Sequence, residues 1–156
     1  MTNMGFWDFS LAVYKQPCVE QASLDLQDRQ GFDVNLALWC VWLSMKGRKP
    51  GSALSTAIPL VESWNGSVTY QLRELRRSVK GVTGAETVYR KLLDAELECE
   101  RLIQSRLDEL FDQTEISNGS PRETARLNLA DYAHAIDRKA SFERFISAVF
   151  QSREMV

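Results

Sequence analysis

Apolar residues recur along much of this chain at steps of three and four, a spacing that places them on one face of an α-helix. The two longest such segments run from Ser52 to Lys80 and from Glu86 to about Phe111. The short stretch "GVTG" at 81–84 joins them, so we expect an antiparallel helical hairpin. Pro59 and Asn65-Gly66 lie inside the first segment and predict a kink or a short break there. The apolar positions are Leu54, Ile58, Val61, Trp64, Val68, Leu72, Leu75 and Val79 in the first segment, and Val88, Leu92, Ala95, Cys99, Leu102, Ile103, Leu107 and Leu110 in the second.

Shorter helical segments account for most of the remaining chain. They are expected at residues 6–15, 17–30 and 34–47, from 120 onward, and around 142–150. Asp33 is placed to cap the third of these helices. The stretches "TGAE" at 83–86 and "SPRE" at 120–123 are typical of capping boxes. Strand signals are nearly absent, and "GRKPGS" at 47–52 is expected to be a loop.

The stretch "VNLALWCVWL", Val34 to Leu43, contains a single polar residue, Asn35, among nine apolar ones. About thirteen helical residues span only about 20 Å, which is too short for a bilayer. A helix that is apolar on all sides is normally buried on all sides. We therefore expect a central core helix, with Trp39 and Trp42 either in the core or lining a pocket or a partner groove.

These patterns together predict an all-α fold. We expect one single-domain bundle over residues 1–156, made of six or seven helices around the central apolar helix, with a long antiparallel helical hairpin. A chain of 156 residues is long enough to bury a sizeable core.

Composition and charge exclude several classes of protein. The formal net charge of −2 gives no overall attraction to nucleic acid or anionic lipid, so we expect neither nucleic-acid binding nor membrane insertion. Three cysteines, Cys18, Cys40 and Cys99, form no close-spaced pair, so buried reduced thiols are expected. The first residues lack a basic leader and an uninterrupted apolar region, which predicts a cytoplasmic protein rather than a secreted one.

Known catalytic and metal-binding patterns are missing from the sequence. His134 is the single histidine, so a di-iron bundle site cannot be built, and a zinc site made of His134 and the three scattered cysteines has no support from their spacing. Phosphate-binding loops, dinucleotide fingerprints and nucleophile elbows are also absent. The carboxylates in "LLDAELECERL", Asp94 to Glu100, are expected to form a solvated face. We therefore expect no metal, no cofactor and no enzymatic activity.

Two surface features are candidates for binding. Arg73, Arg76, Arg77 and Lys80 in "RELRRSVK" form the one basic cluster, either as cations at a helix C-terminus or as a patch for an anionic partner that Arg48 and Lys49 can join. The N-terminal stretch "FWDFSLAVY", which includes Trp7, has aromatic residues on more than one helix face. It is expected to be either core or a partner or dimer interface.

Phe6 to Leu43 also resembles a known block of sequence. The patterns F-W-x-F-S-L, then L-Q-D-x-x-G-x-D-V-N-L, and then the apolar run resemble the opening of an uncharacterised family of proteobacterial proteins, a domain of unknown function. The resemblance implies a bacterial cytosolic protein and carries over no catalytic residue. Within the pattern, Trp7, Gln27, Asp28, Asp33 and Asn35 are polar or aromatic residues beside the apolar helix, which either fasten it or form a site.

Two functions from different classes are consistent with these observations. The first is a non-catalytic protein-interaction module, such as an adaptor, regulator or assembly factor, acting on a protein partner or as a homodimer. The second is a small-molecule-binding protein or enzyme with an interhelical pocket near Asp33, Asn35, Trp39 and Trp42. The candidate binding residues are therefore Trp7, Asp33, Asn35, Trp39 and Trp42.

Overall fold

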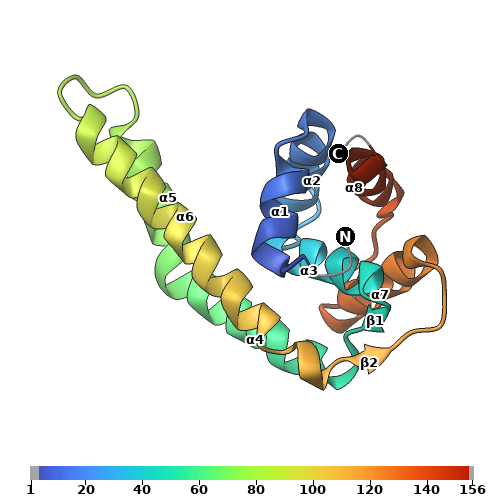
Figure 1. The fold of residues 1–156 in the computed structure, drawn as a ribbon. Helices are drawn as coiled ribbons and strands as arrows, with labels where there is room; N and C mark the ends of the chain where they lie inside the picture. Colours follow the sequence, from blue (N-terminus) through green and yellow to red (C-terminus); the bar gives the residue numbers. More distant parts are fainter. Residues whose placement is uncertain (1–3, 155–156) are drawn as a thin grey trace.

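The computed structural model describes residues 4–154 and shows an all-α fold with a globular part and a projecting arm (Figure 1). The globular part contains α1 (Phe6–Tyr14), α2 (Pro17–Asp28), α3 (Val34–Met45), α7 (Pro121–Ala135) and α8 (Glu143–Glu154). The arm contains α4 (Leu54–Trp64), a π-helical turn (Asn65–Thr69), α5 (Tyr70–Val79) and α6 (Glu86–Asp108). Single 3-10 turns occupy Gly51–Ala53 and Phe111–Gln113.

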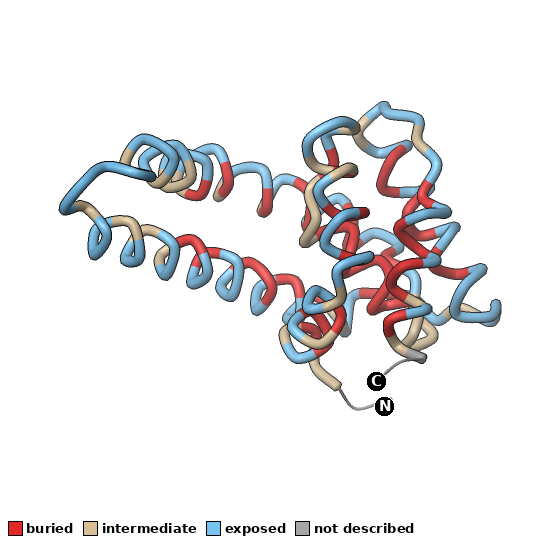
Figure 2. The backbone as a smooth tube through the Cα atoms, turned by 90° about the horizontal axis from the view of Figure 1, so that it is seen from above, coloured by how far each residue is buried: buried red, intermediate tan, exposed pale blue. Residues whose placement is uncertain are grey.

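Helix α3 is the buried centre of the globular part, as its composition predicts. Every residue from Leu36 to Ser44 is buried, and α3 packs against α7 as well as α1, α2, α4 and α6. Asp33 caps the helix, because its Oδ1 accepts a hydrogen bond from the Leu36 backbone N–H at 2.9 Å. Figure 2 shows that buried residues concentrate in this globular part and thin out along the arm.

The predicted hairpin is confirmed by α4, α5 and α6. The π-helical turn at Asn65–Thr69 replaces the expected kink, so the chain stays helical from Leu54 to Val79. Counted as one helix, this stretch brings the described helices to seven, in agreement with the six or seven expected. Helix α5 differs from every other arm segment because none of its ten residues is buried.

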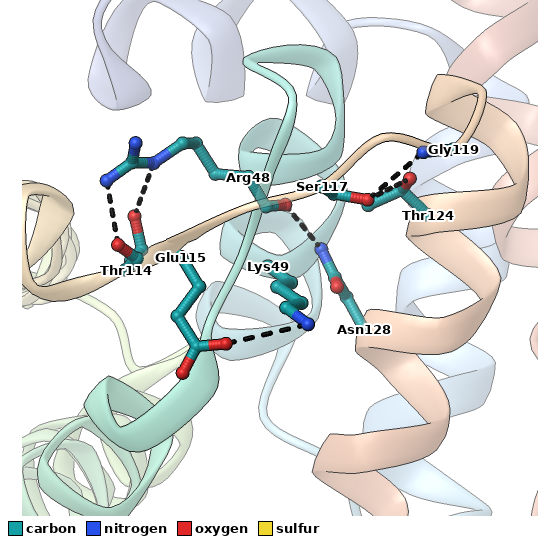
Figure 3. Close-up of polar contacts among 8 residues, drawn as sticks. All are labelled: Arg48, Lys49, Thr114, Glu115, Ser117, Gly119, Thr124 and Asn128. Carbon is teal, nitrogen blue, oxygen red and sulfur yellow. Dashed lines mark hydrogen bonds and ion pairs between the residues drawn. The ribbon is translucent and has the colours of Figure 1, made fainter.

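A small antiparallel ladder replaces part of the predicted loop at 47–52. Strand β1 (Arg48–Lys49) pairs with β2 (Glu115–Ile116), and Arg48 lies opposite Ile116. The Arg48 guanidinium donates to Thr114 Oγ1 at 2.9 Å and to the Thr114 carbonyl at 2.7 Å (Figure 3). Asn128 on α7 donates to the Arg48 carbonyl at 3.1 Å. The ladder therefore joins the base of the arm to the globular part.

Two local predictions are wrong. The 83–86 capping box does not form, since α6 begins after Ala85 without a side-chain cap and Glu86 Oε1 instead accepts from the Gly84 N–H at 3.4 Å. Cys18 is exposed rather than buried: it lies in the first turn of α2 at the margin of the contact with α8, where its Sγ is 3.9 Å from the Ala148 carbonyl, whereas Cys40 and Cys99 are buried as expected. The cap at Ser120 is confirmed, with its Oγ accepting from the Glu123 N–H at 3.3 Å.

None of the helices within residues 4–154 combines the length and the apolar character needed to cross a membrane.

Candidate functional site

A pocket of about 270 Å³ lies where the globular part meets the arm. Helix α1, the start of α3, the π-helical turn, α5 and α6 all contribute to its wall. The lining residues are Trp7, Ser10, Leu11, Tyr14, Gln27, Phe32, Asp33, Val34, Asn35, Leu38, Asn65, Thr69, Tyr70, Arg73, Leu97, Glu100, Ile103 and Gln104. Its volume is close to the lower limit for small-molecule sites, which begins at about 300 Å³.

Local sequence explains why the first helix reaches both the core and the pocket. Phe6, Phe9 and Val13 recur at helical spacing and are almost completely buried. Trp7, Leu11 and Tyr14 recur on the neighbouring face and line the pocket. The aromatic residues on two faces of this helix are therefore divided between the core and the pocket wall.

Asp33 holds one end of the pocket together. One carboxylate oxygen caps α3, and the other accepts a hydrogen bond from Asn65 Nδ2 at 2.8 Å. Burial raises the pKa of the Asp33 carboxyl, while the hydrogen bonds from the Leu36 N–H and Asn65 oppose that shift. Asn65 is the first residue of the π-helical turn, so this hydrogen bond attaches the turn to the start of α3. Such turns often occur at functional sites.

Gln104 on α6 is a buried polar residue whose amide is only partly satisfied. Its Nε2 donates to Ser10 Oγ and to Asn35 Oδ1, each at 2.8 Å. These two bonds fix the amide orientation and leave Oε1 buried with no hydrogen-bond partner among residues 4–154. Thr69 Oγ1, on the π-helical turn, is also buried and has no hydrogen-bond partner among residues 4–154. Two wall residues therefore have an oxygen without a hydrogen-bond partner: the Gln104 amide oxygen, which can only accept, and the Thr69 hydroxyl, which can accept or donate.

The ionisable groups in the wall carry more negative than positive charge. Asp33 and Glu100 are acids, and Arg73 is the one basic residue among the lining side chains. Desolvation raises the pKa of Glu100, an effect that Arg73 opposes and Asp33 reinforces. Desolvation raises the pKa of Tyr14 as well, with a further contribution from the negative charge of Glu100. The Arg73 guanidinium lies 5.6 Å from the Tyr70 ring centre.

The structure brings together three of the five residues proposed from sequence. Trp7, Asp33 and Asn35 line the pocket, but Trp39 and Trp42 do not. Both indoles point into the core from later turns of α3, with Trp39 fully buried and Trp42 only 4% exposed. Trp42 Nε1 donates to the Met4 carbonyl at 3.0 Å. Of α3 only Val34, Asn35 and Leu38, all in its N-terminal five residues, line the pocket, which is why Asn35 lies in the wall and the two indoles do not.

The basic cluster on α5 is divided between two roles. Arg73 and Arg76 form ion pairs with Glu96 of α6, a nearly buried carboxylate that the sequence assigned to a solvated face. Arg77 and Lys80 are exposed. Arg48 and Lys49 do not join them, because Arg48 is bound to Thr114 and Lys49 lies 3.5 Å from Glu115 at the other end of the arm (Figures 1 and 3). Two of the four residues of the proposed anionic-partner patch are therefore engaged within the arm, where they share the single carboxylate of Glu96.

Four polar residues of the pocket wall were not predicted from the sequence, because only the packing of distant segments brings them to the pocket. Asn65, Thr69, Glu100 and Gln104 sit on the two arm helices, and nothing in their local pattern distinguishes them from other polar helix residues. Only Asn65 gave a signal, as part of the Asn-Gly pair at the expected break. Over residues 4–154, the structure contains no group of three or more His, Cys, Asp or Glu residues arranged to hold a metal ion.

Comparison with known proteins identifies one related family. Residues 5–107 match a family model described as "Protein of unknown function (DUF2390)". This range contains every residue that lines the pocket, whereas α7 and α8 lie beyond it. No curated protein and no solved structure matches the chain.

Proposed function

Because the chain belongs to the DUF2390 family, which is described as a protein of unknown function, we propose a function from the pocket itself. We propose that the protein is a non-catalytic binding protein for a small organic molecule that carries a protonated amine on an apolar body. The observation that carries the proposal is that two residues of the pocket wall, Gln104 and Thr69, each have a buried oxygen, Oε1 and Oγ1, without a hydrogen-bond partner among residues 4–154. A buried polar atom without a partner costs about 1–3 kcal/mol, which a donating ligand would recover.

The charge of the wall supports an amine as the donor. Two carboxylates and one guanidinium give the lining a formal charge of −1 when all three are ionised, and Glu96 already pairs with the guanidinium. An ammonium group offers three donors and no acceptor, which matches a wall where unpaired acceptors are in excess. The aromatic rings of Trp7, Tyr14 and Tyr70 supply faces for the apolar body and attract a nearby cation.

The hydrogen bonds within the wall support binding without catalysis. Both oxygens of Asp33 are already occupied, one by a backbone N–H and one by Asn65, so this carboxylate acts as a structural support. Gln104, Asn35 and Ser10 are likewise bound to one another. These bonds between Asp33, Asn35, Gln104 and their neighbours hold much of the wall in place, and such pre-organisation favours ligand binding.

Thermal unfolding with matched ligands tests this proposal. We expect 2-phenylethylamine, but not the isosteric 2-phenylethanol, to raise the melting temperature of the full chain. At a hundred times its dissociation constant, a bound ligand adds about 2.7 kcal/mol to the free energy of unfolding. Trp7 is the tryptophan that lines the pocket, so a Trp7→Phe variant should lose most of the ligand-induced fluorescence change.

Two variants locate the binding. Glu100→Gln removes one charge from the wall, and Thr69→Val removes one buried acceptor with little change of shape, so each should weaken amine binding about tenfold. Glu74→Gln removes a charge from an exposed position on α5 outside the pocket and should leave binding unchanged. Equal binding of the amine and the alcohol would overturn the amine preference. No response to either compound or to a broad metabolite panel would overturn the proposed function.

Protein interaction is a second candidate function, and the surface of the arm favours it. Several large apolar side chains that belong to the helical stripes of α5 and α6 remain exposed, among them Leu75 and Val88 at 54% and 51%. Exposed apolar stripes on paired helices are typical of contact surfaces for further helices. This candidate is independent of the pocket and is developed below.

A further inference from the structure

An apolar stripe runs along α6 on the side away from the pocket. Val88, Ala95 and Leu102 are spaced seven residues apart, so they stay within about 40° of one another around the helix. Val88 and Leu102 are 51% and 36% exposed. At about 100° per residue, the pocket-lining Leu97, Glu100 and Gln104 lie roughly 170° away from the stripe. The stripe and the pocket therefore use opposite faces of the same helix.

Helix α5 extends this face across the hairpin. Leu75 is 54% exposed and lies about 120–160° around α5 from Thr69 and Arg73, which line the pocket. It therefore belongs to the same side of the arm as the α6 stripe. Figures 1 and 2 show the outer part of the arm projecting beyond the globular helices, and the exposed fractions of Leu75, Val88 and Leu102 show that residues 4–154 leave these side chains accessible. The face is open to a partner.

Two charged residues make the stripe self-complementary. Lys91 and Glu98 are both exposed and alternate with the three apolar residues, giving the order Val88, Lys91, Ala95, Glu98, Leu102. Neither charge has an ion-pair partner in the part of the chain that the structure describes. In the reverse direction the stripe again has an apolar residue at each end and the small Ala95 in the middle, but the positions of the positive and negative charges are exchanged.

We propose that α6 packs antiparallel against α6 of a second copy of this chain, with Ala95 at the two-fold axis. An antiparallel pair centred there places Val88 opposite Leu102 of the other copy and Lys91 within one residue of Glu98, about 1.5 Å along the axis, which is within reach of the two side chains. A two-fold interface uses the same patch on both subunits, so a self-complementary stripe is what it requires. The small Ala95 side chain allows the two helices to approach closely at the centre.

The resulting assembly is a four-helix bundle built from two hairpins. Each hairpin supplies α5 and α6, and Leu75 from each copy adds to the seam between them. An unrelated helix could cover the apolar residues, but it would have no reason to match both the size and the charge pattern of the stripe. The pockets stay accessible, because they lie on the opposite faces of the two α6 helices.

Sedimentation equilibrium of the full chain tests the proposal through a charge exchange. We expect a concentration-dependent dimer. Lys91→Glu alone, or Glu98→Lys alone, places like charges opposite each other twice in the dimer and should raise its dissociation constant by about tenfold or more. The double variant restores opposite charges and should dimerise like the unchanged protein. Arg90→Glu alters an exposed charge of α6 outside the stripe and should leave the dimer intact.

The rescue by the double variant separates the proposed contact from a folding defect, since a misfolded arm would not recover when both charges are exchanged. A chain that is monomeric at all concentrations overturns the proposal. A dimer that ignores the single exchanges, or one that the double exchange fails to restore, overturns it equally. Ligand binding by the dimer and by the single variants should be the same, so failure here leaves the pocket proposal standing.

Discussion

Asp33 links three segments that are far apart in the sequence. Its carboxylate caps α3 and accepts from Asn65 in the arm, and its backbone N–H donates to the Tyr132 hydroxyl on α7 at 2.9 Å. A helix cap adds about 0.5–2 kcal/mol of stability. The bond to Asn65 adds to this value, because without it the Asn65 amide would be buried with one donor unpaired.

Replacing Asp33 by alanine should therefore lower the free energy of unfolding by about 1.5–5 kcal/mol, the sum of the lost cap and the unpaired Asn65 amide. Asp33→Asn keeps an acceptor for the Leu36 N–H but loses the one for Asn65 Nδ2, so it should cost less than alanine by the value of the helix cap. Urea unfolding followed by circular dichroism measures both variants. An alanine variant as stable as the asparagine variant would show that the carboxylate is not a structural support.

The sequence was sufficient to identify Asp33, Asn35 and Trp7, because each belongs to a pattern with a local cause. Asp33 precedes an apolar run and is therefore a cap, Asn35 is the polar exception in that run, and Trp7 lies on the second face of an aromatic helix. Trp39 could not be assigned in the same way. A helix that is apolar on every side gives no direction, so only its packing against α7 and the other helices shows which indole faces the core.

At the scale of elements, long periodic helices were predictable and the short ladder was not. The hairpin follows from sixteen apolar positions at regular steps, and this periodicity remains visible through the π-helical turn. Strands β1 and β2 have two residues each, too few to show any alternation. Their pairing depends on the contacts of Arg48 with Thr114 and of Asn128 with the Arg48 carbonyl, which join segments over sixty residues apart.

Two neighbouring residues of β1 should differ sharply when replaced. Arg48 donates two hydrogen bonds to Thr114 and lies 5.0 Å from the centre of the Phe111 ring, so Arg48→Ala should destabilise the protein by about 2–3 kcal/mol (Figure 3). Lys49 forms a half-exposed ion pair with Glu115, and Lys49→Ala should cost less than about 1 kcal/mol. Chemical denaturation of the two variants gives the comparison. Similar losses for both would mean that the ladder depends on its backbone bonds alone.

At the scale of the whole molecule, the pocket lies at the junction between the globular part and the arm. Helices of the globular part supply Trp7, Tyr14 and Asn35 to its wall, and the arm supplies Thr69 and Glu100. Two polar residues at this junction, Thr69 and Gln104, have a buried oxygen without a hydrogen-bond partner among residues 4–154. Binding sites commonly retain such groups at the expense of stability, and a substitution that improves stability then weakens function.

Glu100 allows this trade-off to be tested, since removing its charge should raise the stability of the protein and weaken its binding of the amine. Desolvation raises the pKa of Glu100, so the folded protein binds this proton more tightly than the unfolded chain does. The resulting stabilisation is complete below the unfolded pKa, about 4.3 for a glutamate, and is lost as pH rises through the higher folded value.

At pH 7 the ionised side chain is therefore unfavourable, and Glu100→Gln should be more stable than the unchanged protein while binding the amine more weakly. The stability difference should shrink as pH falls toward about 4, where the glutamate itself becomes neutral. Urea unfolding midpoints measured across this pH range test the prediction, with Glu74→Gln as the control for the loss of one negative charge. A lower stability of Glu100→Gln at neutral pH would show that the ionised Glu100 side chain is not unfavourable in the folded protein.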